Sequence, residues 1–397
     1  MSSTIRHSVL LVLVMCLMRP ASAIAQSAAP ANPVTVAARF DAEGLSQLLA
    51  PVAIGGKTFW CSIDSGGSWV LTLHTAKALA AGLRPNAAGS SAGAGPEVVA
   101  DQRVRGVDVS VGAVTLPDLT IVLRDQPSIV PDMDCVFGLA LLQDYVVEFD
   151  YETPRIRIFD AQTFRPPNGV TPLPFELNRF RQPYIGATMT LATGDEIRSN
   201  LVIDTGTSYY SAVWVKSFLD SHDVRSRIGL VVPEHAHTPG LVLSAARPTR
   251  LTVGPHAVSN PVIALLSSAS AGLTEDGTLG AGFLRRFTVT FDYRHKLVWL
   301  VPNGRFEEPQ PFDASGIEFG YASDGALTIE AIARDSPAAA AGFQPGDRLV
   351  RIDGRGADSV TLRDVKTILS RANTICELRV DRKGELRTAT LRLVKRL

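Results

Sequence analysis

Short runs of alternating apolar and polar residues make up much of the chain, and they end at glycine, proline or aspartate. A period of two residues predicts β-strands, and these turn formers predict tight connections between the strands. Pro51–Ile63 therefore indicates two strands joined at Gly55 and Gly56, and Tyr184–Ile203 indicates two more joined at residues 192–195. The pattern predicts a mainly β fold.

Helical patterns are short in this part of the chain. One helix is expected over Thr75–Ala81 and a second over Val213–Ser221, each following one of the strand pairs. A cluster of proline, asparagine and glycine at residues 166–169 predicts a boundary between two similar halves.

The two halves resemble each other residue by residue. Gly138–Phe159 and Gly280–Val301 each contain a glycine, a short apolar stretch, a Phe-Asp-Tyr triplet, a turn and a second apolar strand. They lie 142 positions apart, and the same shift relates Gly112 to Gly254. Landmarks in one order at one spacing indicate an internal duplication.

The duplication includes a short polar motif. Asp64-Ser65-Gly66 in the first half corresponds to Asp204-Thr205-Gly206 in the second, at a shift of 140 positions. Each copy follows an apolar strand. An isolated copy of such a motif would be an ordinary turn, but two copies at matching places in a duplicated chain indicate a shared function.

The pattern changes after residue 305. Residues 306–312 predict a linker, and residues 313–397 form a third unit of the size of a small domain. Its turns are marked by Ser336-Pro337-Ala338 and Gly346-Asp347. A helix is expected over Leu362–Arg371, with strands over Glu377–Val380 and Thr388–Val394.

Composition and charge narrow the class of protein. The 397 residues are 46% hydrophobic and 20% charged, and basic and acidic residues number 39 each, so no basic surface for nucleic acid is indicated. Residues 1–25, with the apolar run Ser8–Met18, predict a signal peptide. We expect export across the inner membrane to the periplasm. No later segment is apolar for long enough to span a membrane.

The motif at Asp64 admits two chemistries, because Asp-Ser-Gly-Gly also surrounds the nucleophile of serine proteases. A nucleophilic Ser65 needs a base, usually histidine, and the only histidine before it is His7 in the predicted signal peptide. The second copy has Thr205 in the place of Ser65, whereas Asp204 keeps the carboxylate. The carboxylates are therefore the better candidates.

Two such carboxylates have a known chemistry when they meet. They cannot both ionise cheaply, so they share one proton. The ionised member is a general base for water, and the protonated member donates a hydrogen bond to the substrate carbonyl. The glycines that follow, Gly66 and Gly206, allow backbone N–H groups to approach the carboxylates closely.

At this point the chain resembles a known family. Asp64–Ser68 with Val136-Phe137-Gly138, and Asp204–Ser208 with Thr278-Leu279-Gly280, are similar to the two active loops of pepsin-like and retropepsin-like aspartic proteases. The resemblance covers roughly residues 34–305. It implies a bilobal fold, with lobes at 34–165 and 166–305 that face each other across a substrate cleft.

The resemblance also implies roles for individual residues. Asp64 and Asp204 would form the catalytic pair, and Ser65 and Thr205 would lock the two loops together. The remaining motif residues would support the pair from outside, and these are Gly66, Ser68, Gly206 and Ser208.

Two features of the first lobe remain open in the sequence. In the implied fold, Cys61 and Cys135 each lie three residues before a landmark of the active site, so a disulfide between them and two buried free thiols are both compatible with the sequence. The glycine-rich stretch Gly89–Pro96 is either a mobile flap over the cleft or a plain surface loop.

The third unit resembles a PDZ domain of the type attached to bacterial envelope proteases. The similarity rests on Ser336-Pro337-Ala338, Gly342-Phe343, Gly346-Asp347 and Ile352-Asp353-Gly354. It implies a loop that binds a peptide C-terminus by strand addition. That loop would consist of Gly316, Ile317, Glu318 and Phe319.

Together these patterns predict an exported aspartic endopeptidase with a C-terminal PDZ domain. Peptide or protein substrates are expected, and water attack on a peptide bond requires no metal and no organic cofactor. Two rival hypotheses stay open. One is a non-catalytic peptide-binding protein that keeps the fold, and the other is a PDZ-containing serine protease that uses Ser65.

Overall fold

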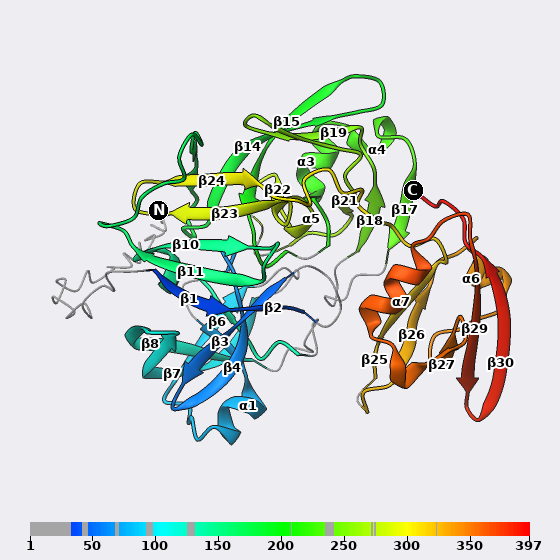
Figure 1. Cartoon of the computed structure of the whole chain (residues 1–397), viewed down its shortest axis with the longest axis horizontal. Coiled ribbons are helices and arrows are strands. Elements are labelled where there is room, and N and C mark those ends of the chain that lie inside the picture. The colour runs from blue at the N-terminus through cyan, green and yellow to red at the C-terminus, as the bar shows by residue number, and fades with distance from the viewer. Residues whose placement is uncertain are drawn as a thin grey trace, which may run out of the picture.

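A computed structural model describes residues 33–41, 47–67, 71–92, 98–124, 132–207, 209–234, 242–270, 273, 275–322 and 324–397. The predicted signal peptide, Ser68 and Ser208 lie outside these residues. The chain forms two β-rich lobes, blue to cyan and green to yellow in Figure 1, and a smaller C-terminal domain in orange and red.

The first lobe is one eight-stranded sheet with two short helices. Its strands follow the order β2-β3-β4-β9-β5-β8-β7-β6. The elements are β2 (Arg39–Phe40), β3 (Leu48–Ile54), β4 (Lys57–Ile63), β5 (Leu71–His74), α1 (Thr75–Ala80), β6 (Ala87–Ala92), β7 (Val98–Val111), β8 (Val114–Arg124), β9 (Cys135–Phe137) and α2 (Leu139–Leu142). The predicted strand pair around Gly55 and Gly56 and the predicted helix at Thr75 are both confirmed.

The second lobe repeats this arrangement in a ten-stranded sheet. Its main path is β17-β18-β21-β16-β22-β15-β14-β19-β20, with β13 beside β14. The elements are β13 (Glu176–Leu177), β14 (Pro183–Thr190), β15 (Glu196–Ile203), β16 (Ala212–Trp214), α3 (Lys216–Ser221), α4 (Val224–Arg227), β17 (Val231–Glu234), β18 (Leu243–Ala246), β19 (Arg250–Val253), β20 (His256–Ser259), β21 (Ile263–Leu266), β22 (Gly277–Leu279) and α5 (Ala281–Leu284).

The matching strand order supports the duplication. The run β3-β4-β9-β5-β8-β7-β6 corresponds to β14-β15-β22-β16-β21-β18-β17. The long strands β7 and β8 of the first lobe are each divided in the second, into β18 with β19 and β20 with β21. Gly112 and Gly254 make the equivalent turns, with φ angles of +57° and +55° that favour glycine.

Two local predictions need correction. The predicted helix over Val213–Ser221 is wrong at its start, because residues 212–214 pair with β21 and β22 as a strand and the helix begins only at Lys216. The stretch Gly89–Pro96 is not a loop throughout. Residues up to Ala92 belong to β6, which pairs with β7, and residues 93–97 lie outside the described chain.

A six-stranded sheet joins the lobes. Its order is β1-β11-β10-β23-β24-β12, so the equivalent strands β10 and β23 meet at the centre, as Figure 1 shows. Its strands are β1 (Val34–Ala37), β10 (Tyr145–Asp150), β11 (Arg155–Asp160), β12 (Leu173–Pro174), β23 (Phe287–Asp292) and β24 (Leu297–Pro302). Most buried hydrophobic residues of the two lobes belong to one cluster that includes residues of this sheet.

The C-terminal domain has a hydrophobic core of its own. Its elements are β25 (Ile317–Tyr321), β26 (Leu327–Ile332), α6 (Pro337–Ala340), β27 (Arg348–Ile352), β28 (Arg355–Gly356), the 3₁₀ turn η1 (Ala357–Ser359), α7 (Leu362–Leu369), β29 (Ile375–Arg382) and β30 (Glu385–Arg392). Thr361 and Asp364 form a capping box that starts α7. The expected helix and both strands are confirmed, and the strands are longer than predicted.

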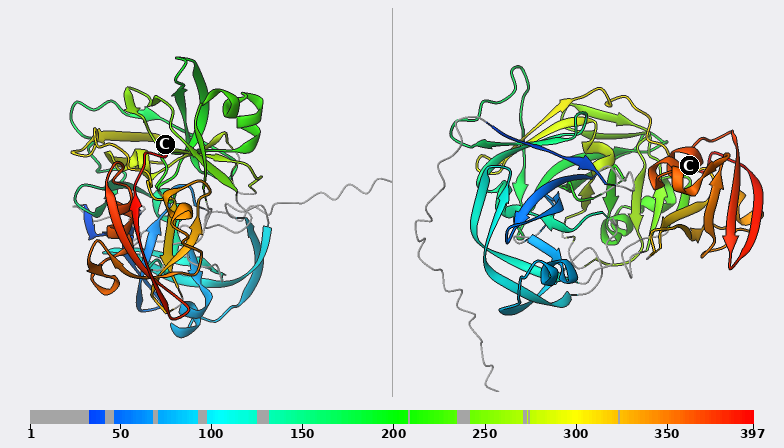
Figure 2. Two further views of the ribbon diagram at one scale, coloured as in Figure 1. Left: turned by 90° about the vertical axis from the view of Figure 1, so that its right-hand side faces the viewer. Right: turned by 60° about the horizontal axis from the view of Figure 1, so that its bottom comes forward.

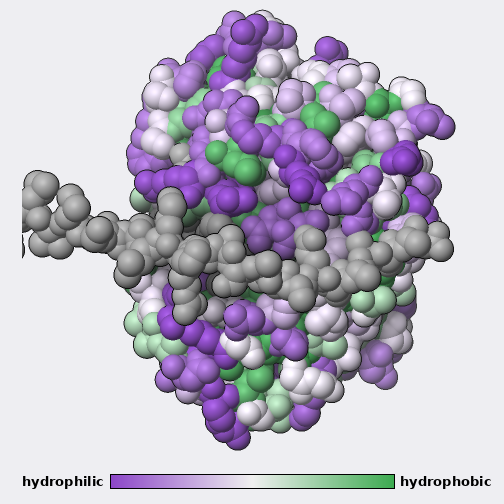
Figure 3. Space-filling model, turned by 90° about the vertical axis from the view of Figure 1, so that its left-hand side faces the viewer, coloured by the Kyte–Doolittle hydropathy of each residue, from purple (hydrophilic) through white to green (hydrophobic). Residues whose placement is uncertain are grey.

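In Figure 1 and in the right-hand view of Figure 2, the C-terminal domain lies at one end of the two-lobed body, next to the second lobe. Leu397 is buried in a small cluster with Phe312 and residues of that lobe. On the face shown in Figure 3, hydrophilic residues cover most of the described surface and hydrophobic residues form small patches. Within the described part of the chain, no helix is long and apolar enough to cross a membrane.

Candidate active site

Equivalent strand ends position the two aspartates. β4 runs parallel to β9 and β15 runs parallel to β22, with Ile63 opposite Phe137 and Ile203 opposite Leu279. Immediately after each strand, the backbone N–H of the aspartate continues the pairing. Asp64 donates to the Phe137 carbonyl at 2.9 Å, and Asp204 donates to the Leu279 carbonyl at 3.0 Å. The parallel pairing therefore starts each active loop at the same place.

The structure brings the two carboxyl groups together at the lobe interface. A Cβ atom on Gly66 would lie 2.3 Å from Asp204 Cγ, and one on Gly206 would lie 2.4 Å from Asp64 Cγ. Each glycine is therefore packed against the carboxyl group of the opposite lobe, where no side chain fits. Burial, the charge of Asp204 and a hydrogen bond with Asp204 hold the pKa of the Asp64 carboxyl well above its usual range.

Ser65 and Thr205 lock the loops together reciprocally. The Ser65 N–H donates to Thr205 Oγ1 and the Thr205 N–H donates to Ser65 Oγ, both at 3.0 Å. Each hydroxyl also donates across the interface, Ser65 Oγ to the Ile203 carbonyl at 2.6 Å and Thr205 Oγ1 to the Ile63 carbonyl at 2.7 Å. These four bonds fix the separation of the two carboxyl groups.

The hydrogen-bond donors around the two carboxyl groups differ. In each loop the glycine N–H donates to its own aspartate Oδ1 at 2.8 Å, from Gly66 to Asp64 and from Gly206 to Asp204. Asp204 also accepts two bonds from Thr207, from its N–H at 3.0 Å and from its hydroxyl at 2.6 Å. The equivalent residue of the first lobe is a glycine and has no hydroxyl.

The resemblance does not indicate Thr207, because it places the supporting hydroxyl on the serine one position later. The predicted contacts of Ser68 and Ser208 lie outside the described residues. The sequence does indicate a role for Thr207, because a hydroxyl three residues after an aspartate can donate a hydrogen bond to its carboxylate.

The repeated Phe-Asp-Tyr triplets place two tyrosines beneath the carboxyl pair. Tyr151 and Tyr293 are buried, and burial together with the charges of Asp64 and Asp204 raises the pKa of both phenols. The Tyr293 hydroxyl donates to the Ser65 carbonyl at 3.3 Å. The sequence marked these triplets as repeat landmarks only, because their distance from the aspartates along the chain hides the contact.

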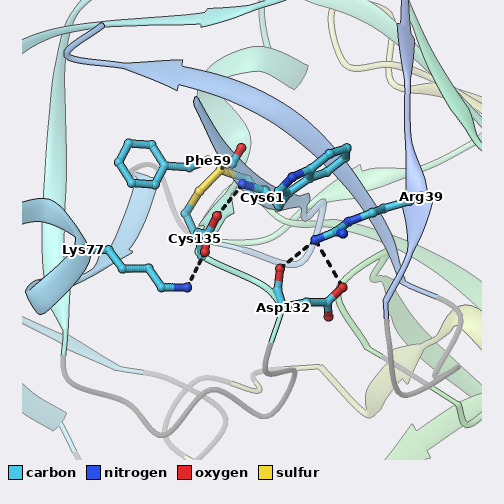
Figure 4. The surroundings of a disulfide bond; sticks show 8 residues. Arg39, Phe59, Cys61, Lys77, Asp132 and Cys135 are labelled. Carbon is cyan, nitrogen blue, oxygen red and sulfur yellow. Dashed lines mark hydrogen bonds and ion pairs between the residues drawn. A yellow bond between two sulfur atoms is a disulfide. The ribbon is translucent and has the colours of Figure 1, made fainter. Parts of the chain in front are cut away.

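A disulfide lies close to the first loop. Cys61 in β4 and Cys135 in β9 are bonded, with their Cα atoms 4.5 Å apart, and Figure 4 shows the bridge between the two strands. An adjacent hydrogen bond of 2.7 Å, from the Trp60 N–H to Asp134 Oδ2, joins β4 to the residue that precedes β9. The sequence is compatible with a disulfide and with two buried free thiols, and the structure contains the disulfide. This bond covalently joins β4, which leads into the active loop of Asp64, to its neighbour β9.

The predicted peptide-binding loop of the C-terminal domain, Gly316–Phe319, lies at the start of β25. This strand is the last of its sheet, pairing with β26, and α7 packs beside it. The Gly316 N–H donates to Asp313 Oδ2 at 2.6 Å, and the Ile317 N–H donates to Ser315 Oγ at 2.9 Å. These two N–H groups are therefore engaged within the chain, while the outer edge of β25 pairs with no described strand.

Comparison with protein families agrees with this architecture. Residues 50–140 match the aspartyl protease family, and residues 328–382 match the PDZ domain. The chain thus combines a retropepsin-like aspartyl protease domain with a PDZ domain, as its sequence predicts. No curated protein matches the chain significantly. The aspartyl protease match covers only the lobe that contains Asp64. The assignment of the second lobe to the same fold therefore depends on the duplicated strand order.

The described residues contain no group of three or more histidine, cysteine, aspartate or glutamate side chains placed to hold a metal ion.

Proposed function

We propose that the protein is an aspartic endopeptidase that hydrolyses peptide bonds through Asp64 and Asp204. The reciprocal contact of each glycine with the opposite carboxyl group is the observation that carries this proposal. Two carboxyl groups that hydrogen-bond each other retain one proton between them. One group can then accept a proton from water while the other donates a hydrogen bond to the substrate carbonyl.

The donors around each carboxyl group assign these two roles. Asp204 accepts three bonds, from the Gly206 N–H and from both donors of Thr207, and hydrogen bonds of this kind stabilise the ionised form. Among the described residues, Asp64 has no equivalent of the Thr207 hydroxyl, because Gly67 stands at that position. Asp204 is therefore the base that activates water, and Asp64 holds the proton and polarises the scissile carbonyl. The proton that Asp204 takes from water can then pass to the leaving amine.

The contacts of Ser65 disfavour the serine protease hypothesis. Its hydroxyl is buried, donates to the Ile203 carbonyl and accepts from the Thr205 N–H. A nucleophile has to face the substrate and bond to a base. Ser65 instead faces the lobe interface.

The test is cleavage of a diverse peptide mixture by the mature chain, residues 26–397, between acidic and neutral pH. Asp64→Asn and Asp204→Asn should each lower turnover by at least about 10³-fold, because each removes a group that acts in the chemical step. Asp160→Asn is the matched control, since Asp160 accepts bonds from a turn in the same way, at 2.7 Å from the Gln162 N–H. Unchanged cleavage by both active-loop variants would overturn the proposal, and an absence of cleavage by the wild type at every pH would favour the non-catalytic, peptide-binding alternative.

The C-terminal domain and the first 25 residues complete the proposal. The PDZ domain is proposed to bind an extended peptide by strand addition to the open edge of β25, beside α7. Export to the periplasm is proposed from the predicted signal peptide. The Cys61–Cys135 disulfide supports it, because disulfides persist mainly in oxidising compartments.

A further inference from the structure

Two glutamines cross the lobe interface and contact the active loop of the opposite lobe. Gln47 Nε2 donates to the Gly206 carbonyl, and Gln182 Nε2 donates to the Gly66 carbonyl. Gln47 immediately precedes β3, and Gln182 immediately precedes the equivalent strand β14. The two glutamines thus occupy matching positions in the duplicated lobes and make the same contact in opposite directions.

Each contacted carbonyl belongs to a peptide group that also serves a catalytic carboxyl. The Gly206 carbonyl shares its peptide group with the Thr207 N–H, which donates to Asp204. The Gly66 carbonyl shares its peptide group with the Gly67 N–H, which hydrogen-bonds Asp64. A donor on the carbonyl polarises the peptide and strengthens its N–H as a donor, because hydrogen bonds in a chain reinforce each other.

The surroundings of Gln47 argue against a role in stability alone. The residue is 7% exposed, and its Oε1 is buried with no hydrogen-bond partner among the described residues. A buried acceptor without a partner is unfavourable. Its backbone N–H donates to Asp41 Oδ2 at 2.8 Å, which fixes the residue in place. An apolar side chain would fill this position without that cost, so the amide is useful here only through its donor.

Gln182 is held differently. Its Oε1 accepts from Asn178 Nδ2 at 2.8 Å, and its N–H donates to Asn178 Oδ1 at 3.0 Å. Both ends of this amide are therefore engaged, and the two glutamines provide a natural comparison within one molecule.

We propose that Gln47 and Gln182 are positioning residues that stabilise negative charge on Asp204 and Asp64 through the intervening peptide groups. This inference rests on the proposed protease function and deepens it. Each lobe would stabilise the ionised form of the carboxyl group on the other lobe. The division of negative charge between the two carboxyl groups would then depend on the contact between the lobes.

Substitution by methionine tests this proposal, because methionine has nearly the same shape but no donor. Gln47→Met should move the acid limb of the pH profile of kcat/KM to higher pH by about half to one unit, because ionised Asp204 loses support. Gln182→Met should instead move the alkaline limb to higher pH, because Asp64 then keeps its proton longer. A purely structural role would lower kcat without moving either limb.

Two controls separate this proposal from the proposed function and from misfolding. Gln162→Met makes the same chemical change at an exposed turn and should leave both limbs in place. Carbon-13 NMR titration of labelled aspartates in the full mature chain follows the carboxyl groups without any activity, so it decides the question even if the wild type cleaves nothing. The melting temperature of Gln47→Met should change little, because removal of the unpaired acceptor offsets the loss of the hydrogen bond to the Gly206 carbonyl. If Gln47→Met does not fold, the Gln182→Met titration decides.

Titration midpoints in both glutamine variants equal to those of the wild type would overturn the proposal, whatever the rate of cleavage. Shifts in both variants, each on its own limb, with an unchanged Gln162→Met profile, would support it.

Discussion

Asp64 lies where a charge is unfavourable. It is packed against Gly206 of the opposite lobe and hydrogen-bonds the carboxyl of Asp204. Its pKa is raised first by burial and then by Asp204. A carboxyl group with a raised pKa in the folded state favours folding while it is protonated, and this contribution is lost as the pH rises through that pKa.

Asp64→Asn should therefore change the pH dependence of stability. In acid, where Asp64 is protonated, the variant and the wild type should have similar free energies of unfolding. Towards neutral and alkaline pH the variant should become the more stable of the two, because it cannot ionise. Thermal unfolding between pH 3 and pH 8 measures this. A constant difference at every pH would contradict the expectation.

At the scale of elements, the parallel strands β4 and β9 carry the first active loop. They are joined by their pairing and by the Cys61–Cys135 disulfide, which closes a chain separation of 74 residues. The second lobe has Leu201 opposite Gly277 at the same register and needs no covalent link. The disulfide is thus a feature of one lobe rather than of the fold.

Replacing both Cys61 and Cys135 by alanine should lower the free energy of unfolding by about 2–4 kcal/mol. Denaturant unfolding with and without a reducing agent provides the measurement, and reductant should destabilise the wild type but not the double variant. Cys376→Ala is the control. Burial raises the pKa of the Cys376 thiol to about 12, so it stays protonated and should not alter the response to reductant.

At the scale of the whole molecule, Gln310 connects the PDZ domain to the protease. It lies in the segment predicted as a linker, yet its side chain is buried. Its Oε1 accepts from Ser211 Oγ at 2.7 Å and from the Val262 N–H at 3.0 Å, and its Nε2 donates to the Tyr209 carbonyl. The segment before the PDZ domain is therefore fixed to the chain that leaves the second active loop.

Gln310→Ala leaves these groups without partners and should destabilise the protein by about 1–3 kcal/mol for each buried group that stays unpaired. Because Tyr209 follows the Asp204 loop closely, kcat should also fall. Gln344→Ala, at an exposed position of the PDZ domain, should change neither quantity. Unfolding curves and peptide cleavage test both parts, and normal stability and turnover in Gln310→Ala would show that the contact has no role in either.

The sequence by itself determined the duplication, the aspartate loops and the PDZ unit, because these depend on local patterns and on order along the chain. Tertiary structure alone revealed the contacts of Gln47 with Gly206 and of Gln182 with Gly66, which join residues 159 and 116 positions apart. The same holds for Tyr293 and Gln310. A hydrogen bond across two packed lobes depends on the angle at which the lobes meet, and no local period or spacing encodes that angle.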